Sequence, residues 1–66
     1  MEIIVNGKNL QTDENTTVLD VVKMQNINTT MFAVERNLKI IPKSEYESTI
    51  LHEGDKIEIV KFVGGG

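Results

Sequence analysis

The sequence lacks cysteine altogether and contains one histidine, His52, among its 66 residues. Without cysteine the chain can form neither disulfides nor thiolate metal sites, and this composition fits a reducing compartment. A zinc site would need three carboxylates around the single histidine, so we expect no metal centre. A chain of this length forms one domain over residues 1–66, which is too small to enclose a substrate cavity. We therefore expect function to lie on the surface, in the chain ends or in a partner.

Positive charge and aromatic side chains are also scarce. Seven basic against ten acidic residues give a net charge of −3, and no run of Lys or Arg supplies the positive stripe that nucleic acids require. The aromatic residues Phe32, Tyr46 and Phe62 are too scattered to stack bases. No apolar run approaches the roughly 20 residues of a membrane span, and the chain begins without a basic leader. We expect a cytoplasmic protein that binds neither nucleic acid nor membranes.

Alternating apolar and polar residues predict a hairpin at the start of the chain. Residues 1–5 alternate, with Met1, Ile3 and Val5 on one face. The dipeptide Asn6-Gly7 that follows strongly favours a two-residue hairpin turn. Residues 8–12 are therefore predicted to return as the second strand.

The next segment predicts a single helix. Thr17 is followed three residues later by Asp20, a weaker relative of the capping box, and this pair predicts a helix over 18–25. Its apolar stripe consists of Val18, Leu19, Val21 and Val22. Because β-branched residues are poor helix formers, the prediction depends on the cap and the periodicity.

The second half of the chain predicts three more strands. Residues 31–35 and 38–41 are expected to pair across a turn at Arg36-Asn37. Pro42 should occupy the first position of a short helical turn over 42–46, with Tyr46 folding back as a lid on the core. After a turn at 53–55, residues 56–61 alternate as the final strand. One helix over one face of such a sheet makes a compact α+β domain.

Candidate catalytic side chains form no recognisable motif. Ser44, Ser48, His52 and Asp55 are the residue types of a hydrolase triad, but no nucleophile-elbow sequence surrounds either serine. The acidic segment 13–15 lacks the remaining ligands and the glycine of a calcium loop. We interpret both groups as solvated polar residues and assign no catalytic residue.

The run Gly64, Gly65 and Gly66 at the C-terminus is different. It cannot cradle phosphate as a glycine-rich loop does, because no helix follows it. A frayed terminus or a cloning scar would have the same composition. Alternatively, residues without Cβ atoms can enter a narrow active site and present the terminal carboxylate there. Fully extended, a tail over 62–66 reaches roughly 17 Å.

A carboxylate becomes reactive once it is converted to a mixed anhydride, for example by attack on the α-phosphate of ATP. An α-carboxyl pKa near about 3.5 keeps the attacking group ionised at neutral pH. The tail would then need no catalytic side chain of its own, which fits the absence of a base, a metal site and a thiol in this sequence.

Several segments, taken in order, resemble the ThiS/MoaD family of ubiquitin-like β-grasp sulfur carriers. These are residues 4–8 (IVNGK), 17–22 (TVLDVV), 42–46 (PKSEY), 53–60 (EGDKIEIV) and the ending 62–66 (FVGGG). The resemblance implies a mixed sheet of four to five strands, one main helix across one face and a flexible C-terminal tail. Of the family's functional positions, the terminal glycines Gly65 and Gly66 match.

The resemblance also implies a reaction sequence. Gly66 would be adenylated by a ThiF-like enzyme that uses ATP, and then converted to a thiocarboxylate with sulfur from a cysteine desulfurase. A ThiG-like thiazole synthase would take the sulfur for thiamin. The chain itself would bind no cofactor and would be a cosubstrate, not an enzyme. A MoaD-like carrier for molybdopterin or another pathway, and an unmodified interaction module, remain as alternatives.

A β-grasp sheet would also create a docking surface beside the tail. The first and last strands of this fold are adjacent and parallel, and four residues should face the helix: Ile3, Val5, Ile57 and Ile59. The opposite, open face should then carry an apolar patch of Ile4, Val60 and Phe62. We expect these three residues, together with Val63, to dock partners. Acidic neighbours, Glu2 and Glu58, would steer the chain toward basic partner surfaces.

Overall fold

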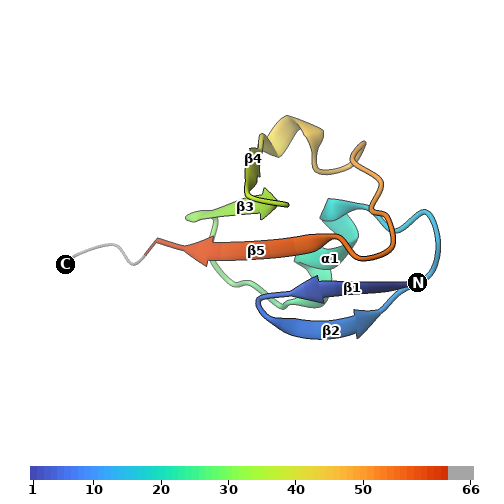
Figure 1. Ribbon diagram of the computed structural model, residues 1–66. Helices are drawn as coiled ribbons and strands as arrows, with labels where there is room; N and C mark the ends of the chain where they lie inside the picture. Colours follow the sequence, from blue (N-terminus) through green and yellow to red (C-terminus); the bar gives the residue numbers. More distant parts are fainter. Residues whose placement is uncertain (63–66) are drawn as a thin grey trace.

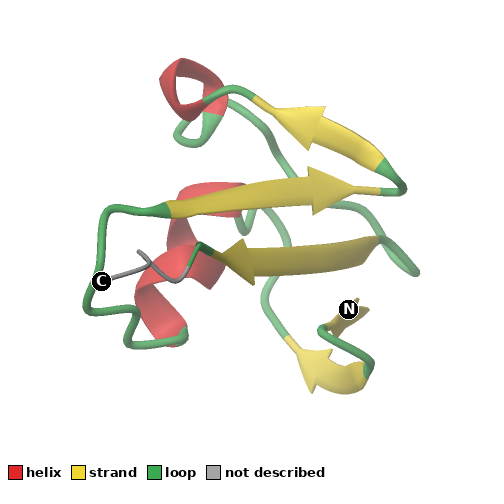
Figure 2. Cartoon of the chain, turned by 90° about the vertical axis from the view of Figure 1, so that its left-hand side faces the viewer, coloured by secondary structure: helices red, strands yellow, loops and turns green. Residues whose placement is uncertain are grey.

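Two hairpins and a final strand form one five-stranded mixed sheet in the computed structural model, which describes residues 1–62 (Figure 1). In chain order the elements are β1 (Glu2–Val5), β2 (Lys8–Gln11), α1 (Val18–Met24), β3 (Phe32–Arg36), β4 (Lys39–Ile41), the 3₁₀ helix η1 (Lys43–Glu45) and β5 (Lys56–Lys61). The strand order β2-β1-β5-β3-β4 places β5 at the centre, parallel to β1 and antiparallel to β3. Figure 2 shows α1 lying across one face of the sheet. The predicted α+β fold is confirmed.

The first hairpin forms as the sequence predicts. β1 and β2 pair in the register Val5↔Lys8, which leaves Asn6 and Gly7 as a two-residue turn. Both turn residues have positive φ, 49° and 80°. A turn with two positive φ angles matches the right-handed twist of the flanking strands, and Asn-Gly adopts it with the least strain.

Helix α1 begins with the predicted capping box. The Asp20 N–H donates to the Thr17 hydroxyl at 3.2 Å, and the Thr17 N–H donates to the Asp20 carboxylate at 3.0 Å. The helix ends at Met24, one residue before the predicted end, with Gln25 as its C-cap. The two bonds satisfy N–H groups that the first helical turn leaves unpaired.

The turn between β3 and β4 lies one residue later than predicted. Arg36 pairs with Lys39, so the turn residues are Asn37 and Leu38, with φ angles of 52° and 71°. Leucine rarely adopts positive φ, so the sequence favoured the wrong pair. The strand register keeps Arg36 in β3, where it pairs with Ile57 of β5. This pairing outweighs the conformational cost of the positive φ at Leu38.

The short helical turn forms, but Pro42 lies outside it. Pro42 is extended, with ψ 145°, and η1 begins at Lys43. Tyr46 is buried, as predicted, with 6% of its surface exposed. Its ring stacks on Phe32 with 6.2 Å between centroids.

The core lies between α1 and the helix-facing side of the sheet. It consists of Ile3, Val5, Val18, Val21, Val34, Tyr46, Leu51 and Ile57, with Ile59 partly buried against it. The predicted orientation of the β1 and β5 side chains is confirmed by this list. Because strand side chains alternate between faces, the residues between them lie on the open face.

A buried carboxylate joins the start of β5 to the β3–β4 turn. Asp55 is buried and accepts hydrogen bonds from the Arg36 guanidinium at 3.0 Å, the Asn37 amide at 3.1 Å and the His52 backbone N–H at 2.8 Å. Burial is the largest single influence and by itself raises the pKa of Asp55. The three hydrogen bonds and the Arg36 charge outweigh it and hold that pKa below its ordinary value.

This lowered pKa predicts acid sensitivity. The Asp55 contribution to folding is complete above the unfolded-state pKa of about 3.9 and is lost as the pH falls through the lower folded-state pKa. We expect Asp55→Asn to lower the Tm at neutral pH and to flatten the loss of Tm between about pH 5 and pH 2. Thermal unfolding followed by circular dichroism across this range measures both effects. Glu47→Gln, at an exposed position, is the control; the same acid dependence in Asp55→Asn and wild type would contradict the assignment.

Candidate functional site

The candidate site is the end of β5 and the open face around it. β5 leads through Phe62 toward the predicted tail, of which Val63, Gly64, Gly65 and Gly66 lie outside the described residues. The sheet supports this strand on both sides near its start and on the β3 side along its whole length. The end of β5 extends beyond the end of β1 (Figure 1).

A side chain in the first turn holds the middle of β5. The Asn6 N–H donates to the Ile57 carbonyl at 2.9 Å, and the Asn6 Oδ1 accepts from the Ile59 N–H at 2.8 Å. The carboxamide therefore continues the β1–β5 ladder for one further bond after β1 has ended at Val5. The strand that leads to the tail is fixed by this contact.

Four apolar residues meet on the open face where β5 ends. Ala33 pairs with Val60, and the Phe62 N–H donates to the Met31 carbonyl at 2.8 Å, which extends the ladder beyond the strand. Strand alternation then places all four on the open face. Three are well exposed: Met31 52%, Val60 43% and Phe62 54%. We call Met31, Ala33, Val60 and Phe62 the tail-proximal patch.

Ile4 lies on the same face but away from this patch. It is half-buried and pairs with Lys56, four residues before Val60. At about 3.3 Å per residue, roughly 13 Å along β5 separates the two positions. The patch that we predicted from the sequence is therefore not contiguous in the structure. Met31 and Ala33 complete it instead, and their place depends on the β3–β5 register, for which the sequence contains no signal.

Two carboxylates face each other beside the patch. Glu35 and Glu58 are register partners in adjacent strands, so their side chains emerge side by side on the open face. Within residues 1–62 neither takes part in a salt bridge, since the one ion pair found there joins Arg36 and Asp55. Like charges directly opposite each other destabilise a sheet. The pair therefore concentrates negative charge on the open face beside the patch.

The residue types of a triad are not assembled into one. The Ser48 hydroxyl donates to the Glu45 carbonyl, and Asp55 binds the backbone N–H of His52, not its ring. In the part of the chain that the structure describes, no three His, Cys, Asp or Glu side chains are placed to hold a metal ion. Over the same residues, no helix is long and apolar enough to cross a membrane.

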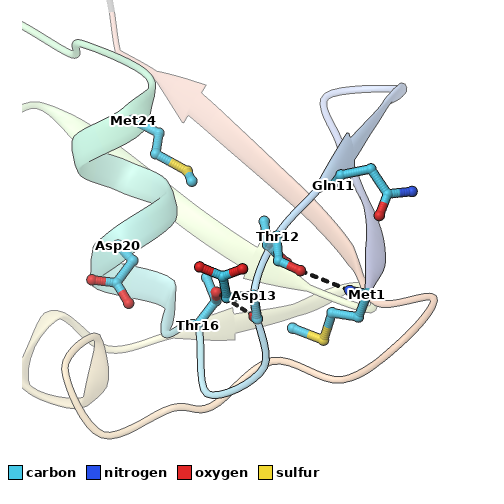
Figure 3. Close-up of a pocket in the computed structure, with 7 residues that line it drawn as sticks. All are labelled: Met1, Gln11, Thr12, Asp13, Thr16, Asp20 and Met24. Atoms are coloured by element: carbon cyan, nitrogen blue, oxygen red, sulfur yellow. Dashed lines mark hydrogen bonds between the residues drawn. The ribbon is translucent and has the colours of Figure 1, made fainter.

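A cleft with a volume of about 600 Å³ lies between α1 and the β2–α1 connection (Figure 3). Several of its polar groups are used by the fold: the Met1 ammonium donates to the Thr12 carbonyl at 2.7 Å and the Thr16 hydroxyl to the Asp13 carbonyl at 2.6 Å. The Thr12 hydroxyl is buried and has no hydrogen-bond partner among residues 1–62. Asp20, which also lines it, belongs to the helix cap. We assign no ligand to this cleft.

The fold and the site together define a β-grasp domain with an exposed apolar patch beside its final strand. The comparisons with known proteins identify the group of such domains to which it is related.

The model of the ThiS family matches residues 2–66. The sulfur carrier protein ThiS of Bacillus subtilis is 40% identical over 63 residues, covering 94% of this chain and 96% of that protein. The chain is also similar to the crystal structure of the thiamine biosynthesis protein ThiS from Geobacter metallireducens. The superposition covers 100% of each chain, with 28% sequence identity and a TM-score of 0.83. The chain belongs to the ThiS family. It is therefore a carrier protein and not an enzyme, and the β-grasp prediction is confirmed.

A longer relative carries the same unit. The thiazole synthase of Paramagnetospirillum magneticum is 39% identical over all 66 residues, but the chain spans only 20% of that protein. A second thiazole synthase, from Magnetococcus marinus, is 33% identical over the same span and is also matched over 20% of its length. The carrier-like unit thus occurs both alone and within larger proteins.

The Asn6 contact predicts a local change when it is lost. Asn6→Gly keeps the positive φ but removes the acceptor, so we expect the Ile59 amide to exchange its hydrogen about tenfold faster, equivalent to roughly 1–1.5 kcal/mol. Asn6→Asp keeps an acceptor oxygen and should preserve protection. Hydrogen exchange followed by NMR measures both variants. Wild-type protection at Ile59 in Asn6→Gly would show that the bond does not hold β5.

Proposed function

We propose that the chain carries sulfur for thiamin thiazole synthesis on the carboxyl group of Gly66. The observation that carries this proposal is the tail-proximal patch at the end of β5, from which the chain continues toward three glycines. The ThiS-family match and the 96% coverage of the Bacillus sulfur carrier support it. An exposed apolar surface beside a chain end allows a partner to bind the domain and receive the tail.

The chemistry requires Gly66 to end the chain with a free carboxylate. One carboxylate oxygen attacks the α-phosphorus of ATP, the bond to pyrophosphate breaks, and an acyl-adenylate forms. Hydrosulfide, which is already at the oxidation level of the product, then attacks the acyl carbon, AMP leaves with the bonding electron pair, and loss of a proton gives the thiocarboxylate. The glycines Gly64, Gly65 and Gly66 contribute narrowness, because no Cβ atom hinders their entry into the partner's active site.

The partners follow from these two steps. A ThiF-like enzyme supplies the ATP site, a cysteine desulfurase route supplies sulfur, and a ThiG-like thiazole synthase accepts it. The thiazole synthases that contain a related unit support this last partner, because joining carrier and acceptor in one chain raises their effective concentration.

Docking of these partners uses the tail-proximal patch, together with Val63 at the base of the tail. Val60 and Phe62 are the apolar contacts nearest to the tail, and Ile4 is an outlying contact on the same face. The unpaired carboxylates of Glu35 and Glu58 select partners with basic groups, because such groups relieve the repulsion between them.

The central test is a mass measurement. The chain is incubated with a ThiF-like enzyme, ATP and sulfide, and a gain of about 16 Da is expected as sulfur replaces one oxygen. One alanine added after Gly66 should abolish the gain, because the carboxylate is displaced from the partner's catalytic groups. No gain with wild type, or full reaction of the extended chain, would refute the proposed function. Transfer to a molybdopterin-forming enzyme in place of a thiazole synthase would change the pathway but leave the carrier chemistry intact.

The docking surface predicts a second result. Val60→Asp places a charge in the tail-proximal patch, and we expect binding to the activating enzyme to weaken about tenfold or more. Leu38→Asp is the matched control, since Leu38 is 87% exposed at the far end of the sheet. Titration calorimetry without ATP measures both. Equal binding by the two variants would show that the tail-proximal patch is not part of the interface.

A further inference from the structure

The last part of β5 has one free edge. In the antiparallel β3–β5 ladder, hydrogen-bonded and non-hydrogen-bonded residue pairs alternate. The hydrogen bonds Phe62 N–H to Met31 carbonyl and Asn37 N–H to Lys56 carbonyl identify the pairs at Phe62 and Lys56 as hydrogen-bonded. By this alternation the backbone groups of Ile57, Ile59 and Lys61 point away from β3. They point toward the side where β1 lies.

β1 is too short to cover this edge. It ends at Val5, opposite Ile57, and the next position is filled by Asn6, whose Oδ1 takes the Ile59 N–H. The β1–β5 pairing stops at Ile57, and in the described part of the chain no side chain or loop hydrogen-bonds to the Ile59 carbonyl or to the Lys61 N–H and carbonyl. Figure 1 shows the end of β5 extending past the end of β1. Two acceptors and one donor thus form a free strand edge beside the tail.

We propose that this edge, residues 59–61, pairs with an extended backbone segment of the enzyme that receives the tail. The inference rests on the proposed function and adds to it the way in which the partner enzyme binds the carrier. An added strand would supply the pairing that β1 supplies further back and would hold β5 on both sides where the tail begins. Affinity from such pairing comes from main-chain hydrogen bonds and so tolerates different side chains.

Position and charge favour this occupant over a second copy of the chain. A partner that receives the tail must lie along the continuation of β5, so it meets this edge directly. Lys61 is exposed on the edge itself, and charged residues on edge strands, lysine above all, oppose self-pairing. The edge also offers few backbone groups, which suits a short added segment better than a stable strand-to-strand dimer.

A proline substitution tests the edge selectively. Lys61→Pro removes the free N–H and fills the edge with the ring, while no bond to β3 is lost because this N–H faces away from β3. Lys61→Ala is the matched control, since it removes the charge and keeps the N–H. Binding to the ThiF-like enzyme is measured by titration calorimetry without ATP, and folding by thermal unfolding.

A synthetic chain with a backbone ester at Lys61 gives an independent variant. It removes the N–H and keeps the side chain and the path of the strand, so it decides the matter even where the proline variant loses stability. We expect the proline variant and the ester chain each to bind the enzyme at least about tenfold more weakly than Lys61→Ala does. The reason is that one hydrogen bond is lost and the neighbouring bonds are disturbed.

Two results would overturn the inference. One is binding by the ester chain equal to that of Lys61→Ala. The other combines two measurements: analytical ultracentrifugation shows that the free wild-type chain is a dimer and Lys61→Pro is a monomer, and Lys61→Pro binds the enzyme as tightly as Lys61→Ala does. The edge would then serve self-association and not enzyme binding. Both are independent of the mass gain that tests the proposed function, because binding is measured without the chemical reaction.

Discussion

The parallel pairing of β1 with β5 brings strands from the start and the end of the sequence together at the centre of the sheet. It spans the pairs Ile4↔Lys56 and Val5↔Ile57, and Asn6 extends it by one bond. Because β5 is then a central strand with its start buried against α1, its far end is carried by a rigid support. Every functional feature proposed for this chain depends on that support, since a tail can be directed into a partner only from a fixed base.

The same pairing is short, and its shortness matters as much as its presence. β1 ends while β5 continues, so the final residues of β5 are held by β3 alone and keep an open edge. The buried Asp55 network fixes the opposite end of β5 to the β3–β4 turn. The strand is thus firmly held at its start and accessible at its end, which suits a carrier whose reactive group must leave the domain surface.

Local signals predicted most of the fold. Asn6-Gly7 predicted the first turn, Thr17 and Asp20 predicted the helix start, and the alternation over 56–61 predicted β5 to the residue. The failures have local causes: Leu38 takes a positive φ that its residue type disfavours, and Pro42 precedes the helical turn that it was expected to begin. At Leu38 the strand register outweighs the local preference of the residue, whereas Pro42 keeps the φ of −64° that its ring imposes and differs from the expectation only in its extended ψ.

The sequence by itself determined which residues are apolar on each strand, where the glycines lie, and that no side chain in this small chain forms a catalytic motif. The tertiary structure alone decided the neighbours: Met31 and Ala33 beside Val60, Ile4 remote from it, Glu35 opposite Glu58, and a free edge at Lys61. The physical reason is that alternation assigns a face to each side chain, whereas register assigns its neighbour. Register follows from hydrogen bonds between strands far apart in the sequence, which no local pattern encodes.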